Sequence, residues 1–185
     1  MNSQETISKT KTSPQASATS IKDILRSIVV LFKLRVVILL VLSSLGGALI
    51  ASDGKVSLSA LGLLLGTGIL SSAGASAINQ YLERSSDALM RRTLNRPLAA
   101  GIVSNPKAIL GIASGFIAIA IGLALLFGNP ALALFLALGA AIYIGIYTVW
   151  LKPRTLLNIV IGGAAGSCAV LSGSAAAGNW SEPGA

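Results

Sequence analysis

Long apolar blocks separated by short polar stretches make up most of the chain from residue 36 onward. A helix that crosses a membrane needs about 20 apolar residues at 1.5 Å each. Five blocks approach or reach that length, and the first is short for a full span unless residues 28–34 extend it. We expect the five spans near residues 36–51, 58–78, 108–127, 131–151 and 156–177. The alternating strands of a membrane barrel are not visible in this pattern.

The composition supports the same interpretation. Of the 185 residues, 54 % are hydrophobic and only 11 % are charged, whereas a soluble domain has about a quarter charged residues. We therefore predict an all-α fold, a polytopic transmembrane helix bundle. Residues 1–20 are polar and lack the apolar core of a secretory signal, so we expect a disordered cytoplasmic tail followed by one membrane domain over 21–185.

Lysine and arginine alternate along the connections between the apolar blocks. Their numbers are six before the first block, one in the first turn, five in the second connection, none in the third, two in the fourth and none after the fifth. Cytoplasmic loops carry the excess of positive residues. We therefore place the N-terminus and the charged second connection in the cytoplasm, in an integral multi-pass protein of a bacterial cell membrane.

The remaining composition limits the chemistry. The chain has no histidine, which removes histidine ligation of zinc or haem and histidine general bases. Its one cysteine, Cys168, cannot form an intrachain disulfide. The net charge of +8 comes from residues that flank apolar blocks, so we expect anionic lipid or an anionic substrate as partner, and no nucleic acid. Frequent glycine and alanine within the blocks predict close helix packing.

Three polar residues share one face where the second apolar block ends. Asn79, Glu83 and Asp87 are spaced four residues apart, so each step rotates the side chain by only about 40° and the set covers about 12 Å of helix. An amide oxygen and two carboxylates are hard ligands that suit Mg²⁺, which shares its coordination with phosphates. A metal site at the helix end is therefore one interpretation of this spacing.

Arginines follow on the same segment, and the guanidinium group matches phosphate oxygens as a planar fork. They are Arg84, Arg91, Arg92 and Arg96. Acids that hold Mg²⁺ beside arginines form a cradle for a diphosphate. The alternative is a solvated cytoplasmic loop in which Asp87 and Arg91 form an ordinary i, i+4 pair. The spacing alone leaves both interpretations open.

The stretch "NQYLERSSDALMRRTLNRPL" resembles the first acidic motif of the UbiA superfamily of membrane prenyltransferases. More closely, it resembles the protohaem IX farnesyltransferases, a family also called haem O synthases. Two further stretches agree with that family, "LFKLRVVILLVLSSLGG" at the start of the first span and "YTVWLKPRTLLNIVIGGAAG" at the end of the fourth. The resemblance runs from about residue 22 to the end of the chain.

The resemblance implies a bundle of about nine helices that transfers a farnesyl group from farnesyl diphosphate to the vinyl group of haem b, giving haem O. It implies Mg²⁺ as cofactor, because the metal and basic residues stabilise the charge on the leaving diphosphate. The helix walls would exclude water from the reacting site. Besides farnesyl diphosphate, haem b and membrane lipid, it names haem A synthase as a candidate partner.

The resemblance also assigns residues. It places the metal–diphosphate motif at Asn79, Glu83 and Asp87, and these form the catalytic set together with Lys152. The positions that match its diphosphate-binding residues are Lys33, Arg35, Arg91, Arg92, Arg96 and Tyr147. Without the resemblance, Tyr147 and Trp150 would be interpreted as an interfacial aromatic belt, and Lys152 as a cytoplasmic anchor.

The chain departs from the family pattern at several positions. Ser85 stands where the family commonly has an aspartate, Leu34 where it has a proline, and Pro153 where it has a second basic residue. The family's second acidic region lies beyond the fifth span, so we expect this chain to be an N-terminal portion with about five of about nine spans. The alternatives are another UbiA prenyltransferase with an aromatic or chlorin acceptor, and a catalytically inactive truncated membrane protein.

Overall fold

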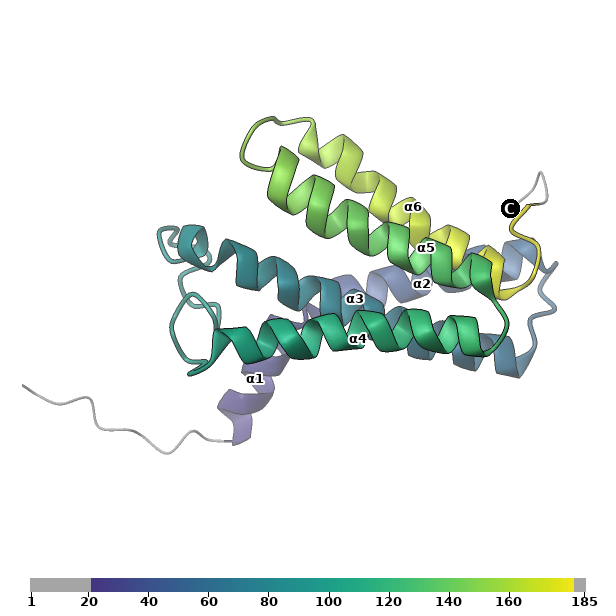
Figure 1. Ribbon diagram of the computed structural model, residues 1–185, viewed down its shortest axis with the longest axis horizontal. Coiled ribbons are helices and arrows are strands. Elements are labelled where there is room, and N and C mark those ends of the chain that lie inside the picture. The colour runs from purple at the N-terminus through teal and green to yellow at the C-terminus, as the bar shows by residue number, and fades with distance from the viewer. Residues whose placement is uncertain (1–20, 182–185) are drawn as a thin grey trace, which may run out of the picture.

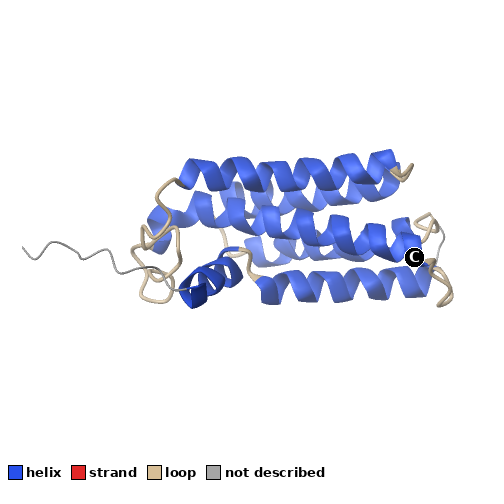
Figure 2. Cartoon of the chain, turned by 90° about the horizontal axis from the view of Figure 1, so that it is seen from below, coloured by secondary structure: helices blue, strands red, loops and turns tan. Residues whose placement is uncertain are grey.

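The computed structural model describes residues 21–181, and the tail expected at 1–20 lies outside the described residues. Every regular element within 21–181 is helical (Figure 2). In chain order the elements are α1 (Ile21–Leu31), α2 (Leu34–Ala51), α3 (Leu58–Asp87), α4 (Pro106–Leu126), α5 (Pro130–Ala141), η1 (Ile142–Leu151) and α6 (Asn158–Ala176). Five helices are long and apolar enough to cross a membrane when α5 and η1 are taken together. The prediction of an all-α bundle with five spans is therefore confirmed for this part of the chain.

The five long helices run side by side, and their connections gather at the two ends of the bundle (Figures 1 and 2). Helix α2 packs on α6, α6 on α5, α5 on α4, and α4 on α3. Contacts between α3 and α2 close the ring. Helices far apart in the sequence, α2 and α6, thereby become neighbours, and α3 contacts every other long helix.

Small residues let the helix backbones approach closely, as the composition predicted. A Cβ atom added to Gly173 of α6 would lie 1.8 Å from the carbonyl oxygen of Ser44 on α2. A Cβ atom on Gly74 of α3 would lie 2.5 Å from the carbonyl oxygen of Ala113 on α4. These distances leave no room for a side chain, so the α2–α6 and α3–α4 contacts both depend on glycine.

Residues 28–33 do not extend the first span, which begins at Leu34. The helix breaks at Lys33, whose backbone is left-handed with φ 46° and ψ 52°. A left-handed residue other than glycine needs compensation, and the Lys33 ammonium supplies it by hydrogen bonding to Asn79 and Tyr143. Helix α2 therefore begins at Leu34, and its 18 residues cover about 27 Å.

Helix α3 continues nine residues past the expected end of the second span at Ile78 and stops at Asp87. Ser57 caps its start, because the Ser57 hydroxyl accepts a hydrogen bond from the backbone N–H of Ala60 at 3.2 Å. Its 30 residues cover about 45 Å, more than the apolar thickness of a bilayer. The polar triad of the sequence analysis therefore lies on a helix rather than in a loop.

The fourth span is continuous from Pro130 to Leu151, but its second half, η1, is wound as a π-helix. In a π-helix each N–H bonds the carbonyl five residues earlier rather than four. The backbone N–H of Lys152 accordingly donates to the carbonyl of Tyr147 at 2.9 Å. This winding brings side chains five positions apart onto one face of the helix, as it does for Tyr147 and Lys152.

Candidate functional site

The polar face of α3 lies inside the bundle at the end where α3 stops. Asn79 is 1 % exposed and Asp87 3 % exposed, while the Glu83 side chain is 11 % exposed. The four-residue spacing brings all three onto one side of the helix, as expected. A buried carboxylate needs a cation or several hydrogen bonds beside it, and the structure supplies cations from three other segments.

Arg96 comes from residues 88–105, which connect α3 with α4 and fold back over the end of α3. Its Nη1 atom lies 2.6 Å from Asp87 Oδ2 and 3.7 Å from Glu83 Oε2. The Thr93 hydroxyl holds the turn by donating to the Asp87 carbonyl oxygen at 2.9 Å. Leu98 is buried beside Ile78 and Ala113, which fixes the connection to the bundle.

Lys152 approaches the same face of α3 from the C-terminal end of η1. Its ammonium forms a salt bridge with Glu83 Oε1. The Lys152 nitrogen also lies 5.8 Å from the centroid of the Tyr147 ring. That ring stacks on the Tyr143 ring with centroids 5.6 Å apart and planes inclined by 8°.

Lys33 is the third cation, and the break before α2 turns its side chain inward. Its ammonium donates to Asn79 Oδ1 and, at 3.1 Å, to the Tyr143 hydroxyl. Burial, reinforced by the nearby Arg96 guanidinium, lowers the pKa of Lys33 from 10.5 to about 8. A neighbouring anion favours the charged form of an amine, so an anion bound here would favour the protonated form of Lys33.

Thr148 and Tyr143 belong to the site although the sequence analysis did not select them. The Asn79 Nδ2 atom donates to the Thr148 hydroxyl at 3.0 Å. That hydroxyl donates in turn to the Tyr143 carbonyl oxygen at 2.7 Å. Thr148 stands in the stretch "YTVWLK", and the match of this stretch to the family was the signal that could have identified it. The five-residue spacing from Tyr143 to Thr148 gave no such signal, because residues five apart do not share a face of an ordinary α-helix.

The structure therefore brings together seven of the ten predicted site residues. They are Lys33, Asn79, Glu83, Asp87, Arg96, Tyr147 and Lys152. Arg35, Arg91 and Arg92 are exposed, and no hydrogen bond or ion pair joins them to the acids within the described residues. The i, i+4 pair of Asp87 and Arg91 does not form, because α3 ends at Asp87 and Arg96 pairs with that carboxylate. A role of the three exposed arginines in binding stays a prediction.

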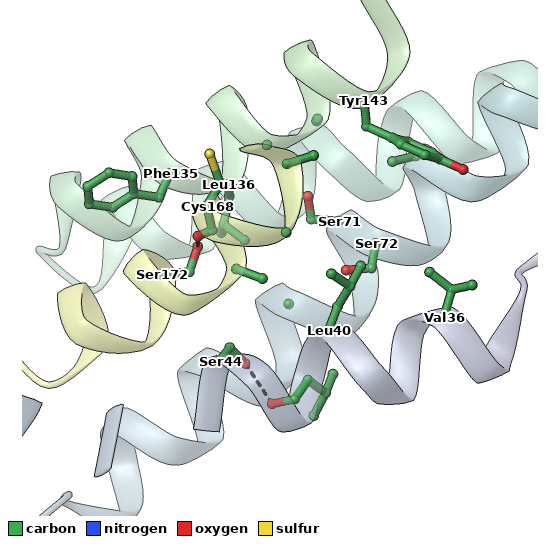
Figure 3. Close-up of a pocket in the computed structure, with 18 of the residues that line it drawn as sticks. Val36, Leu40, Ser44, Ser71, Ser72, Phe135, Leu136, Tyr143, Cys168 and Ser172 are labelled. Carbon is green, nitrogen blue, oxygen red and sulfur yellow. Dashed lines mark hydrogen bonds between the residues drawn. The ribbon is translucent and has the colours of Figure 1, made fainter. Parts of the chain in front are cut away.

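An apolar cavity of about 290 Å³ adjoins this charged cluster (Figure 3). Helices α2, α3, α5, η1 and α6 line it, mostly with glycine, alanine, serine and leucine residues. Tyr143 lines one end of the cavity, with its hydroxyl bound by Lys33. Phe135 and Ser172 lie toward the other end. The site thus has a charged head and an apolar body that share Tyr143.

The donor set allows a divalent cation of the oxygen-loving kind. Within the described residues no group of three or more acidic, histidine or cysteine side chains gathers. Mg²⁺ does not need such a group, because it is commonly held by one or two carboxylates together with substrate phosphates and water. Glu83, Asp87 and the Asn79 amide oxygen supply a set of that kind.

Comparison with known proteins gives consistent results. A profile of the UbiA prenyltransferase family matches residues 40–185. A curated protein of Metallosphaera sedula named "Protoheme IX farnesyltransferase" is 44 % identical over 157 residues, which are 84 % of this chain and 53 % of that protein. A protein of Paramagnetospirillum magneticum named "Protoheme IX farnesyltransferase 2" is 45 % identical over 148 residues, 79 % of this chain and 51 % of its own.

A third relative, the "Protoheme IX farnesyltransferase" of Pyrobaculum arsenaticum, is 44 % identical over 144 residues, 78 % of this chain and 51 % of its own. This chain therefore spans about half the length of the curated relatives it matches. No solved structure matches it.

The pairing of Arg96 with Asp87 predicts a stability difference between arginines of one segment. Arg96→Ala leaves the buried Asp87 carboxylate without its cation, which costs about 3 kcal/mol of unfolding free energy. Arg91→Ala removes an exposed side chain and should change little. Thermal unfolding of the detergent-solubilised chain measures both, and equal unfolding temperatures would contradict the pairing. Adding Asp87→Asn to Arg96→Ala should recover part of the loss, because the unpaired charge is gone.

Proposed function

The chain belongs to the UbiA prenyltransferase family, and we propose that it carries the prenyl diphosphate site of a protohaem IX farnesyltransferase. One observation carries the proposal. The charged cluster and the apolar cavity meet at Tyr143, whose hydroxyl accepts from Lys33 while its side chain lines the cavity. A molecule with an anionic head and a long apolar tail, such as farnesyl diphosphate, matches that arrangement.

We propose that the diphosphate binds to the three cations of the cluster, Lys33, Arg96 and Lys152. Arg96 offers a planar fork for phosphate oxygens, and the lysines offer compact charges. In the described structure Arg96 and Lys152 are paired with Asp87 and Glu83. Binding would exchange those partners, because the basic residues turn to the phosphates while the acids receive a cation.

Asn79, Glu83 and Asp87 would hold Mg²⁺ as that cation. When bound, the metal would stabilise the charge that the leaving diphosphate gains as the allylic C–O bond breaks. The protein's own contribution is positional, because three polar side chains on one rigid helix face present their oxygens together. Tyr147, stacked on Tyr143 beside Lys152, is proposed to border the diphosphate.

The farnesyl tail would occupy the apolar cavity. Along α3 the lining residues run from Ser76 back to Leu64, which is about 18 Å of helix. A volume of about 290 Å³ lies at the lower end of the range for small-molecule pockets. Its mostly apolar lining would also keep water from the reacting carbon.

We further propose haem b as the acceptor, its vinyl group as the site of transfer and haem O as the product. The names of the three relatives support this choice over an aromatic or chlorin acceptor. Haem A synthase stays a proposed partner on the strength of the family resemblance alone.

The chain is an integral multi-pass membrane protein, and we propose that the charged cluster faces the cytoplasm of the cell. Lys33, Arg96 and Lys152 meet at one end of the bundle. Lys55 lies in the connection from the C-terminal end of α2 to the N-terminal end of α3, at the other end of the bundle from these three cations. This distribution follows the positive-inside rule with the N-terminal end of α2 inside.

Two variants separate the head of the ligand from its tail. Ser72→Leu fills part of the cavity and should weaken farnesyl diphosphate binding by about 2 kcal/mol, roughly 30-fold, while inorganic diphosphate binds as before. Lys152→Ala should weaken both ligands. Calorimetric titration of the purified chain with Mg²⁺ present measures the four affinities. An equal loss of inorganic diphosphate binding in Ser72→Leu would refute the division into head and tail.

A chimera tests the acceptor. The matching region of the Metallosphaera sedula protein is replaced by the corresponding residues of this chain, and haems are extracted from membranes that express the product. We expect haem O from the chimera and almost none when it carries Asp87→Asn or Asn79→Ala. A prenylated product other than haem O would overturn the acceptor assignment, and full turnover in both variants would overturn the metal assignment.

The orientation is tested by labelling single cysteines in a Cys168→Ser background. Arg92→Cys should react with an impermeant maleimide only after the cytoplasmic side is opened, whereas Lys55→Cys should react in intact cells. The reverse pattern would invert the topology.

A further inference from the structure

We propose that Thr148 is a positioning residue whose hydroxyl fixes the Asn79 amide with Oδ1 turned into the diphosphate and metal site. The inference rests on the proposed function, because it assigns the group that prepares one of the proposed ligands. Thr148 is 7 % exposed and Asn79 is 1 % exposed, so water does not readily replace the contact between them.

The direction of the hydrogen bonds determines the orientation. A threonine hydroxyl has one proton to donate and two lone pairs to accept with. The Thr148 proton is used at the Tyr143 carbonyl oxygen, 2.7 Å away, and a carbonyl can only accept. Toward Asn79 the hydroxyl can therefore only accept, so the amide group that faces it at 3.0 Å must be the NH₂.

Lys33 gives an independent check on that orientation. An ammonium group donates and cannot accept, so the amide atom that it contacts must be the oxygen. The two neighbours of Asn79 thus require the same orientation from opposite sides of the amide. An amide turned by 180° would set its NH₂ against the Lys33 ammonium, which is also a donor, and its oxygen against the Thr148 hydroxyl, whose proton is already used. Both contacts would be lost.

Only one of these two contacts persists in the proposed complex. Lys33 is one of the cations that would turn to the diphosphate, and its hold on Asn79 would then weaken. The Thr148 hydroxyl is neutral, so it carries no charge that a diphosphate would draw away from Asn79 and the backbone of Tyr143. It therefore keeps the amide oxygen in place when the metal and the phosphate are bound.

The π-helical winding of η1 explains how threonine serves both sides. On an α-helix a threonine hydroxyl bonds the carbonyl three or four residues earlier. Here the acceptor is Tyr143, five residues earlier. The π-helical winding therefore directs the proton of the Thr148 hydroxyl to the Tyr143 carbonyl oxygen. It also turns Thr148 toward the inside of the bundle.

The test compares variants of similar shape by the Mg²⁺ concentration needed for half-maximal binding of inorganic diphosphate, measured by calorimetry on the purified chain. Thr148→Val keeps the shape and removes the hydroxyl. We expect it to raise that concentration about 10- to 100-fold, the usual effect of removing a group that orients a metal ligand. Thr148→Ser keeps the hydroxyl and should retain the wild-type value.

Thermal unfolding without ligand shows how much each variant loses in stability alone. Thr148→Ala serves as the second variant without a hydroxyl if the valine variant does not fold. In an Asn79→Ala background, Thr148→Val should cause no further shift in the Mg²⁺ dependence, because the amide it orients is gone.

The outcomes separate this inference from the proposed function. If the wild-type chain binds diphosphate with Mg²⁺ and Thr148→Val or Thr148→Ala binds with the same Mg²⁺ dependence, the positioning role is refuted and the function stands. The same holds if Thr148→Val shifts the dependence equally in the Asn79→Ala background. If the wild-type chain shows no Mg²⁺-dependent diphosphate binding, both are refuted.

Discussion

The fold around the charged cluster depends on one constraint, a buried carboxylate at the C-terminal end of a helix. Asp87 is the last residue of α3, where the helix dipole is negative and disfavours an anion. It is also almost wholly buried. An ionised carboxylate there requires a cation, and Arg96 provides it at 2.6 Å. For Arg96 to arrive, residues 88–105 must fold back over α3, so this ion pair acts together with the Thr93 hydrogen bond and the burial of Leu98 to hold the longest connection in the described chain.

The same demand organises the elements on the other side of the cluster. Glu83 binds Lys152 and so joins α3 to the end of η1. Asn79 binds Lys33 and so joins α3 to the break before α2. Three cations from three separate segments converge on one helix face, at one end of the apolar cavity. Further back, α3 offers that cavity only small or apolar side chains. One helix therefore supplies both the polar head and the apolar body of the site.

What the sequence could predict followed from regular helix geometry. Asn79, Glu83 and Asp87 are four residues apart, and that spacing means a common face wherever the helix continues. It could not show which arginine pairs with Asp87. Arg91 is the neighbour on a continuous helix, but α3 ends at Asp87, and the turn that follows brings Arg96 to the carboxylate instead. The end of the helix depends on tertiary contacts such as the Thr93 bond and the burial of Leu98.

The contribution of η1 was hidden for a related reason. Five residues separate Tyr143 from Thr148 and Tyr147 from Lys152, and on an α-helix such pairs diverge. The sequence pattern shows an apolar span but carries no mark of π winding, so the match to the family motif identified Tyr147 and Lys152 without explaining how they meet. The left-handed Lys33 was equally hidden, because its cost is balanced by contacts with α3 and η1, far away in the sequence.

Acids and bases in one buried cluster do not cancel its proposed use, because both acids would exchange one cation for another. Before binding, Glu83 and Asp87 are satisfied by Lys152 and Arg96. In the proposed complex with Mg²⁺ and a diphosphate, the metal would satisfy the acids and phosphate oxygens would satisfy the basic residues. Neither carboxylate would be left buried without a cation at either stage, and an unpaired buried charge is the costly case. Asn79 differs from the acids, because its contact with the Lys33 ammonium would weaken when Lys33 turns to the diphosphate. We propose that its orientation is then kept by a neighbour that takes no part in the exchange, the Thr148 hydroxyl that accepts from its NH₂.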